Sequence, residues 1–364
     1  MATDIKVLQL RVRPLSFKLA RPLETAGGAI PSWPVVLLDL QTNAGVVGVS
    51  FVSCFLPMLV KPLVSLVHDL GTLIQGDPLS PKDIDAKLRA MSRLIGTQGP
   101  LATAVTLIEI AAWDALAKTA ELPLCRLLGS APHPLPIYMT VPAMTPARVR
   151  ELTQQALDRK YAGLKLKIGQ ADPAKDVALI EAARSVCGAD FPIMADFNQS
   201  LSVAEATRRI LQMDDLGLAW FEEPTDAKNV AGHSRIAQAA RTPISLGENW
   251  HSPLEAAQNM QSGAADLAMP NIIAIGGISA WLKTAAIAEI HGVPVSGHSY
   301  PEISTNLLPL TTMAHWLEHA DIFDDLFLNP VKPVNGTLAA SELPGFGIAW
   351  DEAVVARSLL QGAV

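Results

Sequence analysis

The sequence predicts an α/β protein in which a small α+β domain precedes a closed (β/α)₈ barrel. From about residue 136, short apolar runs alternate with helical stretches about eight times over about 190 residues, as expected for parallel strands joined by crossover helices. Before that point strands come first and helices follow, which is typical of an α+β domain. An open doubly wound sheet is the alternative, but no G-x-G-x-x-G motif follows the first strand to support it.

The first part of the chain alternates apolar and polar residues, and this alternation predicts an antiparallel meander. Strands are expected at 5–12, 34–40 and 45–52, with a turn at 43–45. Apolar residues at helical spacing then predict a helical block between 56 and 129.

The barrel strands are expected where apolar runs end in a polar residue. In chain order these runs are 136–142, 163–169, 191–198, 218–224, 242–249, 266–271 and 293–299, with a last unit near 325. We therefore divide the chain into an N-terminal domain at 1–133, a barrel at 134–329 and a segment at 330–364 that returns to the first domain.

Bulk composition describes a globular protein and excludes several classes. Of 364 residues, 49% are hydrophobic and 17% are charged, which argues against disorder. The formal charge is −7 and lysine and arginine form no cluster, so no nucleic-acid partner is expected. No uninterrupted apolar stretch reaches the roughly 20 residues of a membrane helix, so no membrane partner is expected. Cys54, Cys125 and Cys187 lack metal-binding spacing and are interpreted as thiols of a reducing, cytoplasmic compartment.

Each predicted barrel strand finishes in a side chain that can ionise or form a hydrogen bond. Successive members of this set are 29, 26, 26, 23 and 27 residues apart, about one strand–helix unit each. They should therefore form a ring at the carboxyl end of the barrel, where the catalytic groups of this architecture lie. The members are Lys167, Asp196, Glu222, Glu248, Asn271 and His298.

Three carboxylates of this ring, Asp196, Glu222 and Glu248, come from successive strands. Gathered in a half-buried site they would repel one another, and a hard divalent cation relieves that conflict. All-oxygen ligands with room for water and substrate favour Mg²⁺. Each acid alone is more simply explained as a solvated loop residue or a helix N-cap, but three in register favour the metal. Asn198, two residues after Asp196, is a candidate for contact with the metal ligands or the substrate.

Lys165 and Lys167 alternate with apolar residues and so share one face of a strand. A lysine beside another cation and near a metal has its ammonium form disfavoured, which lowers its pKa toward that of a general base. Lys167, nearer the strand end, is the better base, and Lys165 would bind an anionic substrate oxygen; both could instead extend to water. His298 faces them across the ring. Together they indicate removal of a proton α to a metal-bound carboxylate through an enediolate.

A set of motifs then identifies a family resemblance. They are LKLKIG (164–169), IMADFNQS (193–200), FEEPT (221–225), LGENW (246–250), LAMPN with IGG (267–277), HSYPEIS (298–304) and AHWLE (314–318). Together they make the chain resemble the enolase superfamily, mandelate racemase subgroup, over nearly its whole length. The resemblance implies a modified (β/α)₇β barrel of the TIM type, a capping domain built from the N-terminal region and the C-terminal tail, and a homo-oligomer, often an octamer.

The resemblance also implies roles for individual residues. It makes the three ring carboxylates the Mg²⁺ ligands, Lys167 the base for the (S)-face and His298 the base for the (R)-face of the substrate. Lys165 would assist on the substrate carboxylate, and Glu318 would donate a hydrogen bond to the developing enediolate. The implied activity is racemisation or epimerisation of a small carboxylate, an α-hydroxy acid of the mandelate type. Dehydration of an acid sugar is the second choice.

Asn271 departs from the family pattern, in which an aspartate is paired with the catalytic histidine. An aspartate would hold the imidazole tautomer and raise its pKa, whereas a neutral amide orients the ring without adding charge. We therefore predict that His298 is a weaker base here. One-sided chemistry through Lys167, or dehydration with His298 as the acid, would then be favoured.

The substrate end of the site is expected beneath residues 16–34, which we interpret as a mobile lid. Leu23 and Ile30 of this segment, with Phe55 from the next loop, would line an apolar pocket suited to an aryl or alkyl group. The same residues could instead anchor the loop. Thr140, at the end of the first barrel strand, is a candidate for binding the substrate carboxylate.

Two other functions remain as alternatives. The stretch HWLEH at 315–319 fits H-x-x-E-H, the inverted zinc-peptidase motif, but that reading leaves the lysine pair and the three acids unexplained. A non-catalytic barrel that binds a carboxylate ligand is the other alternative, with Asn271 as the mark of lost activity.

Overall fold

Eight parallel strands close into a barrel in the computed structural model, which describes residues 4–25 and 28–360. The strands are β4 (Leu135–Val141), β5 (Gly163–Lys167), β6 (Ile193–Asp196), β7 (Phe221–Glu222), β8 (Ile244–Leu246), β9 (Leu267–Ala268), β10 (Val295–Gly297) and β11 (Ala314–His319). The ring closes where Leu317 of β11 pairs with Ile137 of β4. This confirms the barrel predicted from the sequence.

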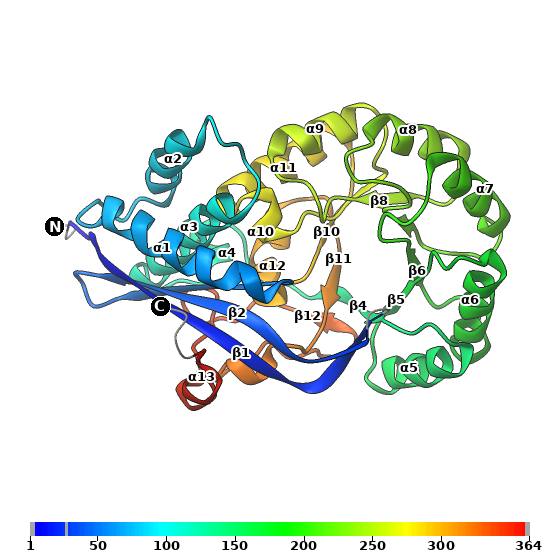
Figure 1. The fold of residues 1–364 in the computed structure, drawn as a ribbon, viewed down its shortest axis with the longest axis horizontal. Coiled ribbons are helices and arrows are strands. Elements are labelled where there is room, and N and C mark those ends of the chain that lie inside the picture. The colour runs from blue at the N-terminus through cyan, green and yellow to red at the C-terminus, as the bar shows by residue number, and fades with distance from the viewer. Residues whose placement is uncertain (1–3, 26–27, 361–364) are drawn as a thin grey trace.

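Helices connect the barrel strands and cover their outer face, as seen on the right of Figure 1. They are α5 (Pro146–Asp158), α6 (Pro173–Cys187), α7 (Val203–Met213), α8 (Val230–Ala239), α9 (Pro253–Gln261), α10 (Ile272–Ile275), α11 (Ile278–His291) and α12 (Pro301–Leu307). Several begin at a proline after a polar N-cap; the side chains of Asp172 and Ser252, for example, accept backbone N–H groups of α6 and α9. After β11 the chain enters a 3₁₀ turn, η3 (Asp324–Leu326), instead of a covering helix, so the barrel is of the (β/α)₇β type.

The last barrel strand is β11 at Ala314–His319, and the expectation of a strand near 325 is wrong. Trp316 packs against Tyr138 inside the barrel, while Leu317 belongs to the core between the barrel and its surroundings. His315 contacts Trp220 and Ser296 on the inner side, across a register shift with β10, and His319 follows Leu317 on the outer side, so the strand has little apolar pattern. The apolar residues near 325 form η3 instead.

The N-terminal part forms a cap beside the barrel, on the left of Figure 1. Its antiparallel sheet contains β1 (Val7–Thr25), β2 (Gly28–Thr42) and β3 (Val47–Ser53), and its helices are α1 (Val60–Ile74), α2 (Pro81–Ser92), α3 (Pro100–Thr119) and α4 (Leu124–Leu127). The C-terminal helix α13 (Glu352–Ser358) lies beside the middle of β1, where Leu359 pairs with Leu15. The C-terminal segment therefore returns to the cap.

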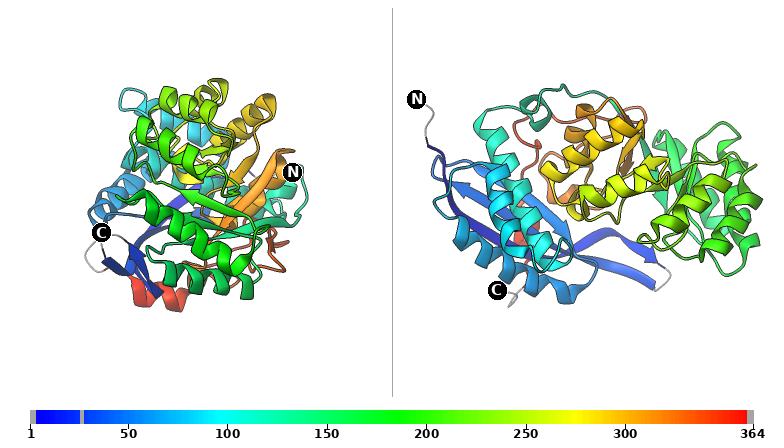
Figure 2. Two further views of the ribbon diagram at one scale, coloured as in Figure 1. Left: turned by 90° about the vertical axis from the view of Figure 1, so that its right-hand side faces the viewer. Right: turned by 90° about the horizontal axis from the view of Figure 1, so that it is seen from above.

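The predicted lid at 16–34 is part of the long β1–β2 hairpin. The hairpin runs from the cap toward the side of the barrel, as Figures 1 and 2 show. Pairing continues through Lys18–Ser32 and, after a register shift, through Leu23–Ile30. Pro31 and Pro34 interrupt the alternation of apolar and polar residues, so the sequence pattern indicates a loop where the structure has strands.

Two helical stretches, Pro57–Ile74 and Pro100–Thr119, are long and apolar enough to cross a membrane by length and composition. The second is 72% buried inside the protein, as expected for the core helix of a soluble domain. The first is 39% buried and packs against β1 and α3. These two stretches are weak support for a membrane span.

Candidate active site at the carboxyl end of the barrel

The predicted ring residues lie at or just after the carboxyl ends of the barrel strands. Neighbouring strands set them side by side, because Lys167 pairs in register with Asp196 and Asp196 with Glu222. Gly247, with φ +139°, turns the chain just before Glu248; a Cβ there would lie 2.8 Å from the backbone of Met269, which follows β9. Asn271 and His298, the other members, follow β9 and β10. Two further site residues, Thr140 and Glu318, lie near the carboxyl ends of β4 and β11.

Lys165 is buried at the centre of this ring. Its Nζ lies 2.8 and 3.1 Å from the two carboxylate oxygens of Glu222, 3.2 Å from Glu318 and 3.7 Å from Asp196. Burial alone would lower the pKa of Lys165, but these negative charges outweigh it and raise the pKa well above the ordinary value. Lys165 is therefore a fixed ammonium in this arrangement.

Lys167 is partly accessible, with 23% of its side chain exposed, and its Nζ contacts Asp196 Oδ2. Burial and the neighbouring charge of Lys165 lower the pKa of Lys167, as the sequence argument expects, but Asp196, Glu222 and Glu248 raise it above the ordinary value overall. The predicted direction of the lysine pKa shift is thus wrong for this arrangement, because the carboxylates outnumber the lysines.

Of the three predicted metal ligands, Asp196 and Glu222 are buried and Glu248 is partly exposed, and their charges conflict. Burial, followed by the charge of Asp196, raises the pKa of Glu222 to about 8. Burial also favours the neutral form of Glu248, but His298 reverses this and holds its pKa well below the ordinary value. As they stand, no three Asp, Glu, His or Cys side chains of the described chain are arranged to coordinate a metal, because lysine and histidine nitrogens hold these oxygens. The chemistry of the donor set, three carboxylates at the ends of adjacent strands, nevertheless fits a hard divalent cation.

Glu318 accepts hydrogen bonds at both oxygens. Thr140 Oγ1 donates to Oε1 at 2.5 Å, and the backbone N–H of Ser299 donates to Oε2 at 3.2 Å. Burial would raise the pKa of Glu318, but Lys165 and His298 lower it to about 2. Glu318 is therefore ionised here and cannot donate the hydrogen bond that the resemblance implies. Thr140 is engaged with Glu318 and not free for a substrate carboxylate.

His298 lies across the ring from the lysines, between two acids and an amide. Its Nε2 is 2.6 Å from Glu248 Oε2 and 3.4 Å from Glu318 Oε2, and its Nδ1 is 3.0 Å from Asn271 Nδ2. Burial lowers the pKa of His298, but Glu318 and Glu248 raise it to about 9. The weaker basicity predicted from Asn271 is thus not seen in this pKa, since two other acids supply the charge.

Two further polar residues border the carboxylates. Asn198 donates to Asp196 through its backbone N–H at 2.8 Å and through Nδ2 at 3.3 Å, so it orients the acid. Glu223, which strand alternation places on the opposite face, is also buried near the site, and Asn249 Nδ2 donates to it at 2.7 Å. Burial, then the charges of Glu248 and Glu222, raise the pKa of Glu223 to about 9. The φ of Glu223 is +37°, so the strand alternation does not extend to this residue. In the sequence, the Pro224 that follows indicates that the strand ends here.

The predicted apolar pocket is only partly described. Leu23 and Ile30 face each other as register partners at the far end of the hairpin, but their side chains lie outside the described residues. Phe55 is 80% exposed and touches Trp33 edge-on, with ring centroids 5.6 Å apart. In this structure Phe55 thus lies on the surface and does not line a closed pocket.

The zinc-peptidase motif at 315–319 lies on β11 and not on a helix. His315 Nδ1 is 3.3 Å from Ser296 Oγ, and His319 Nδ1 is 2.7 Å from Tyr161 OH. In an extended strand, residues four apart are separated by about 13 Å, too far to share one ion. Glu318 also points to the opposite face, into the barrel. The peptidase reading is therefore wrong.

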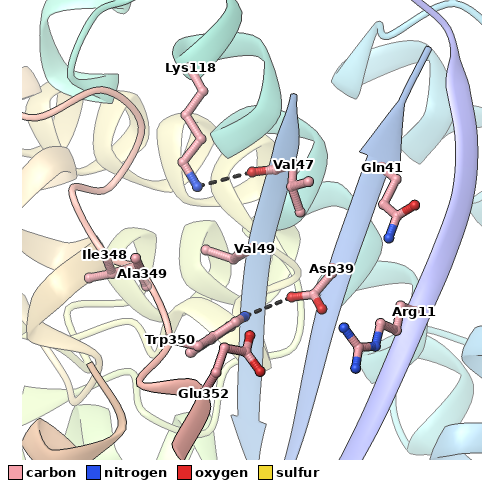
Figure 3. A pocket seen from close by; sticks show the side chains of 10 residues that line it. All are labelled: Arg11, Asp39, Gln41, Val47, Val49, Lys118, Ile348, Ala349, Trp350 and Glu352. Carbon is pink, nitrogen blue, oxygen red and sulfur yellow. Dashed lines mark hydrogen bonds between the residues drawn. The ribbon is translucent and has the colours of Figure 1, made fainter. Parts of the chain in front are cut away.

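A separate cavity of about 370 Å³ lies in the cap, and Figure 3 shows it. Trp350 Nε1 donates to Asp39 Oδ1 at 2.7 Å on its wall, and Lys118 Nζ donates to the carbonyl of Val47 at 3.1 Å. The residues that line it in the described chain come from β1, β2, β3, α3 and the C-terminal segment. This cavity is thus distinct from the ring at the carboxyl end of the barrel.

Two family models match most of the chain. Residues 148–354 match the model of the enolase C-terminal domain-like family, and residues 7–129 match that of the mandelate racemase / muconate lactonizing enzyme N-terminal domain. The chain therefore belongs to the enolase superfamily. Within that superfamily, the pair of domains places it in the mandelate racemase-like subgroup.

Similar proteins differ in their reactions. L-talarate/galactarate dehydratase of Salmonella typhimurium is 30% identical over 356 residues, covering 96% of this chain and 85% of the relative. L-Ala-D/L-Glu epimerase of Bacillus subtilis is 26% identical, covering 98% of this chain and 99% of the relative. The crystal structure of an enolase from Bradyrhizobium in complex with magnesium and mandelic acid is 37% identical, covers 99% of this chain and all of that chain (100%), and has a TM-score of 0.96. The chain is an enzyme of this superfamily, and its relatives include both an epimerase and a dehydratase.

Proposed function

We propose that this enzyme removes the proton α to the carboxylate of an α-hydroxy acid in a Mg²⁺-dependent reaction, with Lys167 as the base. The observation that carries the proposal is the ring itself: three carboxylates on β6, on β7 and just after β8, flanked by two lysines on one side and His298 on the other. This pairing of an all-oxygen cation site with basic nitrogens suits proton removal from a carbon acid.

Asp196, Glu222 and Glu248 would hold the Mg²⁺, which neutralises their mutual repulsion and supplies positive charge that makes the α-proton more acidic. The bound magnesium of the Bradyrhizobium enolase supports this assignment. When these oxygens are engaged with the cation, Lys167 and His298 are free to face the substrate. Lys165, which is buried and remains close to Glu318, is placed to bind an anionic substrate oxygen.

For the complete reaction, racemisation or epimerisation of a mandelate-type acid is the first candidate. The two nitrogen groups at β5 and after β10 lie on opposite sides of the ring, and the Bradyrhizobium enolase binds mandelic acid. Acid-sugar dehydration is the second candidate, favoured by the 30% identity to L-talarate/galactarate dehydratase. Both candidates share the first step, the loss of the α-proton.

The test is a screen for uptake of solvent deuterium. The protein is incubated with Mg²⁺ in D₂O with each enantiomer of mandelate and with a set of sugar acids, and ¹H NMR follows the α-proton and any keto acid. We expect Mg²⁺-dependent exchange with at least one acid, and we expect Lys167→Met to reduce it by about 10³-fold, as for loss of a general base. His315→Ala, which changes the rejected peptidase motif, should leave the exchange as it was.

Two results would contradict the proposal. Exchange that survives in Lys167→Met would remove Lys167 as the base. Tight Mg²⁺ binding without exchange of any acid would instead support the non-catalytic barrel.

A further inference from the structure

The orientation of the Asn271 amide is fixed by the helix that it caps. Asn271 is the N-cap of α10, and its Oδ1 accepts the backbone N–H groups of Ile273 at 2.9 Å and Ala274 at 3.1 Å. Because backbone N–H groups only donate, the atom facing them must be the amide oxygen. The amide nitrogen therefore faces His298 Nδ1, at 3.0 Å. A backbone bridge between Asn271 and His298 holds the two residues side by side.

The opposite nitrogen of the ring faces acceptors. His298 Nε2 lies 2.6 Å from Glu248 Oε2 and 3.4 Å from Glu318 Oε2, and a carboxylate can only accept. Both hydrogen bonds of the ring are satisfied by one neutral tautomer, with the proton on Nε2 and the lone pair on Nδ1. A proton on Nδ1 would instead place two N–H donors 3.0 Å apart. Turning the amide over would remove that conflict but would break both cap hydrogen bonds.

We propose that Asn271 holds His298 in the tautomer protonated at Nε2, so that His298 presents a hydrogen-bond donor to the substrate and not a base. Asn271 is thus a positioning residue. A neutral imidazole held in this way can polarise a substrate oxygen without exchanging a proton with carbon. The stereochemical consequence rests on the proposed function, because it takes Lys167 as the base on the other face.

With His298 held as a donor, proton transfer at the α-carbon is confined to the Lys167 face. The (S)-enantiomer, whose α-proton faces Lys167 according to the family resemblance, should exchange with solvent and keep its configuration. The (R)-enantiomer should exchange far more slowly, and racemisation should lag behind exchange of the (S)-acid by the same factor. If a general base contributes its usual rate factor, that lag is about 10²-fold or more.

The tautomer is tested without any turnover by ¹⁵N NMR of the histidine-labelled, Mg²⁺-loaded protein, in a pH titration that continues until the ring of His298 is neutral. In the neutral ring we expect Nε2 to show a bonded proton and Nδ1 to show the shift of an unprotonated acceptor; the imidazolium at lower pH is also a donor at Nε2. Asn271→Asp keeps an oxygen for the α10 cap but offers Nδ1 an acceptor, so it should move the proton of the neutral ring to Nδ1. A neutral ring protonated at Nδ1 in the unsubstituted protein would overturn the proposal, whatever its activity.

The kinetic arm compares exchange of the two enantiomers in the same preparations. In Asn271→Asp the ratio of (R)- to (S)-exchange should rise by about 10²-fold, and racemisation should rise with it. In Asn271→Ser, which retains an N-cap oxygen but cannot reach His298, Nδ1 loses its fixed donor and the ratio should rise much less. Equal exchange of both enantiomers in the unsubstituted protein would sink the inference and leave Lys167 intact as a base. Absence of exchange from either enantiomer would instead count against the proposed function, while the NMR result still decides the tautomer.

Discussion

Buried charges occur in both the cap and the barrel, but the two regions pair them differently. In the cap, Asp39 is held by Arg13 at 2.8 Å and by Trp350 Nε1 at 2.7 Å, and Arg13 also meets Glu352 at 2.7 Å. The buried acid there, Asp39, has both a cation and a neutral donor, and the other acid, Glu352, is largely exposed. This network links β1, β2 and the C-terminal segment, so it serves the structure of the cap.

In the barrel, three buried acids and the partly exposed Glu248 share two lysines and one histidine. The result is opposite shifts within one site: burial and a neighbouring acid raise the pKa of Glu222 to about 8, while Lys165 and His298 lower that of Glu318 to about 2 against burial. Groups whose environments push their pKa values apart are typical of catalytic sites. In this protein, buried acids that share the same few cations form the functional ring. A buried acid that has its own cation and hydrogen-bond donor supports the structure of the cap.

The largest expected effect that tests this contrast is on Mg²⁺ affinity. Glu222→Gln removes one of the three carboxylates and should weaken Mg²⁺ binding by at least about 100-fold, which isothermal titration calorimetry measures. The free energy of unfolding of this variant should change by no more than about 1 kcal/mol, because the Lys165 ammonium still has Glu318 at 3.2 Å and Asp196 at 3.7 Å. Unaltered Mg²⁺ affinity would show that Glu222 belongs to a structural network like that of the cap.

The reverse outcome is expected for the cap network. Asp39→Asn leaves the buried Arg13 with only the exposed Glu352 and should lower the free energy of unfolding by about 3 kcal/mol, measured by denaturant titration. The matched control is Glu352→Gln, whose carboxylate is 63% exposed and should contribute no more than about 1 kcal/mol. Neither change should alter Mg²⁺ affinity; a loss of affinity in Asp39→Asn would erase the distinction between the two regions.

The sequence predicts the ring well because a parallel barrel leaves few choices. Once each strand is known to end in a polar residue, the spacing of one strand–helix unit places Lys167, Asp196 and Glu222 next to one another. Features that depend on residues from several strands are harder to predict from the sequence. The raised pKa of Lys167 depends on the number of acids from other strands, and the inward position of Glu223 depends on a positive φ that alternation cannot foresee.

Strand boundaries fail where side-chain pattern and backbone pairing disagree. The β1–β2 hairpin contains prolines and pairs across a register shift, so its sequence indicates a loop. β11 contains two histidines and a register shift with β10, so it lacks apolar alternation and the apolar segment after it is mistaken for the strand. The family motifs carry Glu318 to its correct position even so, because a motif does not depend on hydrophobic alternation.

A test that varies pH instead of composition concerns Glu302 on α12, a buried acid that has neither arrangement. It is 2% exposed, and its Oε2 has no hydrogen-bond partner within the described part of the chain. Burial, and to a lesser extent the charge of Asp324, raises its pKa from 4.5 to about 8. Since the folded protein then holds a proton that the unfolded chain has lost, this group stabilises fully below about pH 4.5. Its contribution falls as the pH rises to about 8 and is constant above that.

Glu302→Gln keeps the shape of the side chain and removes its titration. Between pH 5 and 8 the difference in unfolding free energy between the variant and the unsubstituted protein should therefore grow in favour of the variant, by up to about 1.4 kcal/mol per pH unit. Urea titrations at several pH values measure it, and the comparison cancels every group that titrates alike in both proteins. A difference that stays constant across this range would mean that Glu302 is already ionised at pH 5. In that case Glu302, a buried acid without a hydrogen-bond partner at Oε2 in the described chain, would carry its charge in the folded state. The partners of a buried acid would then no longer distinguish the functional ring from the rest of the protein.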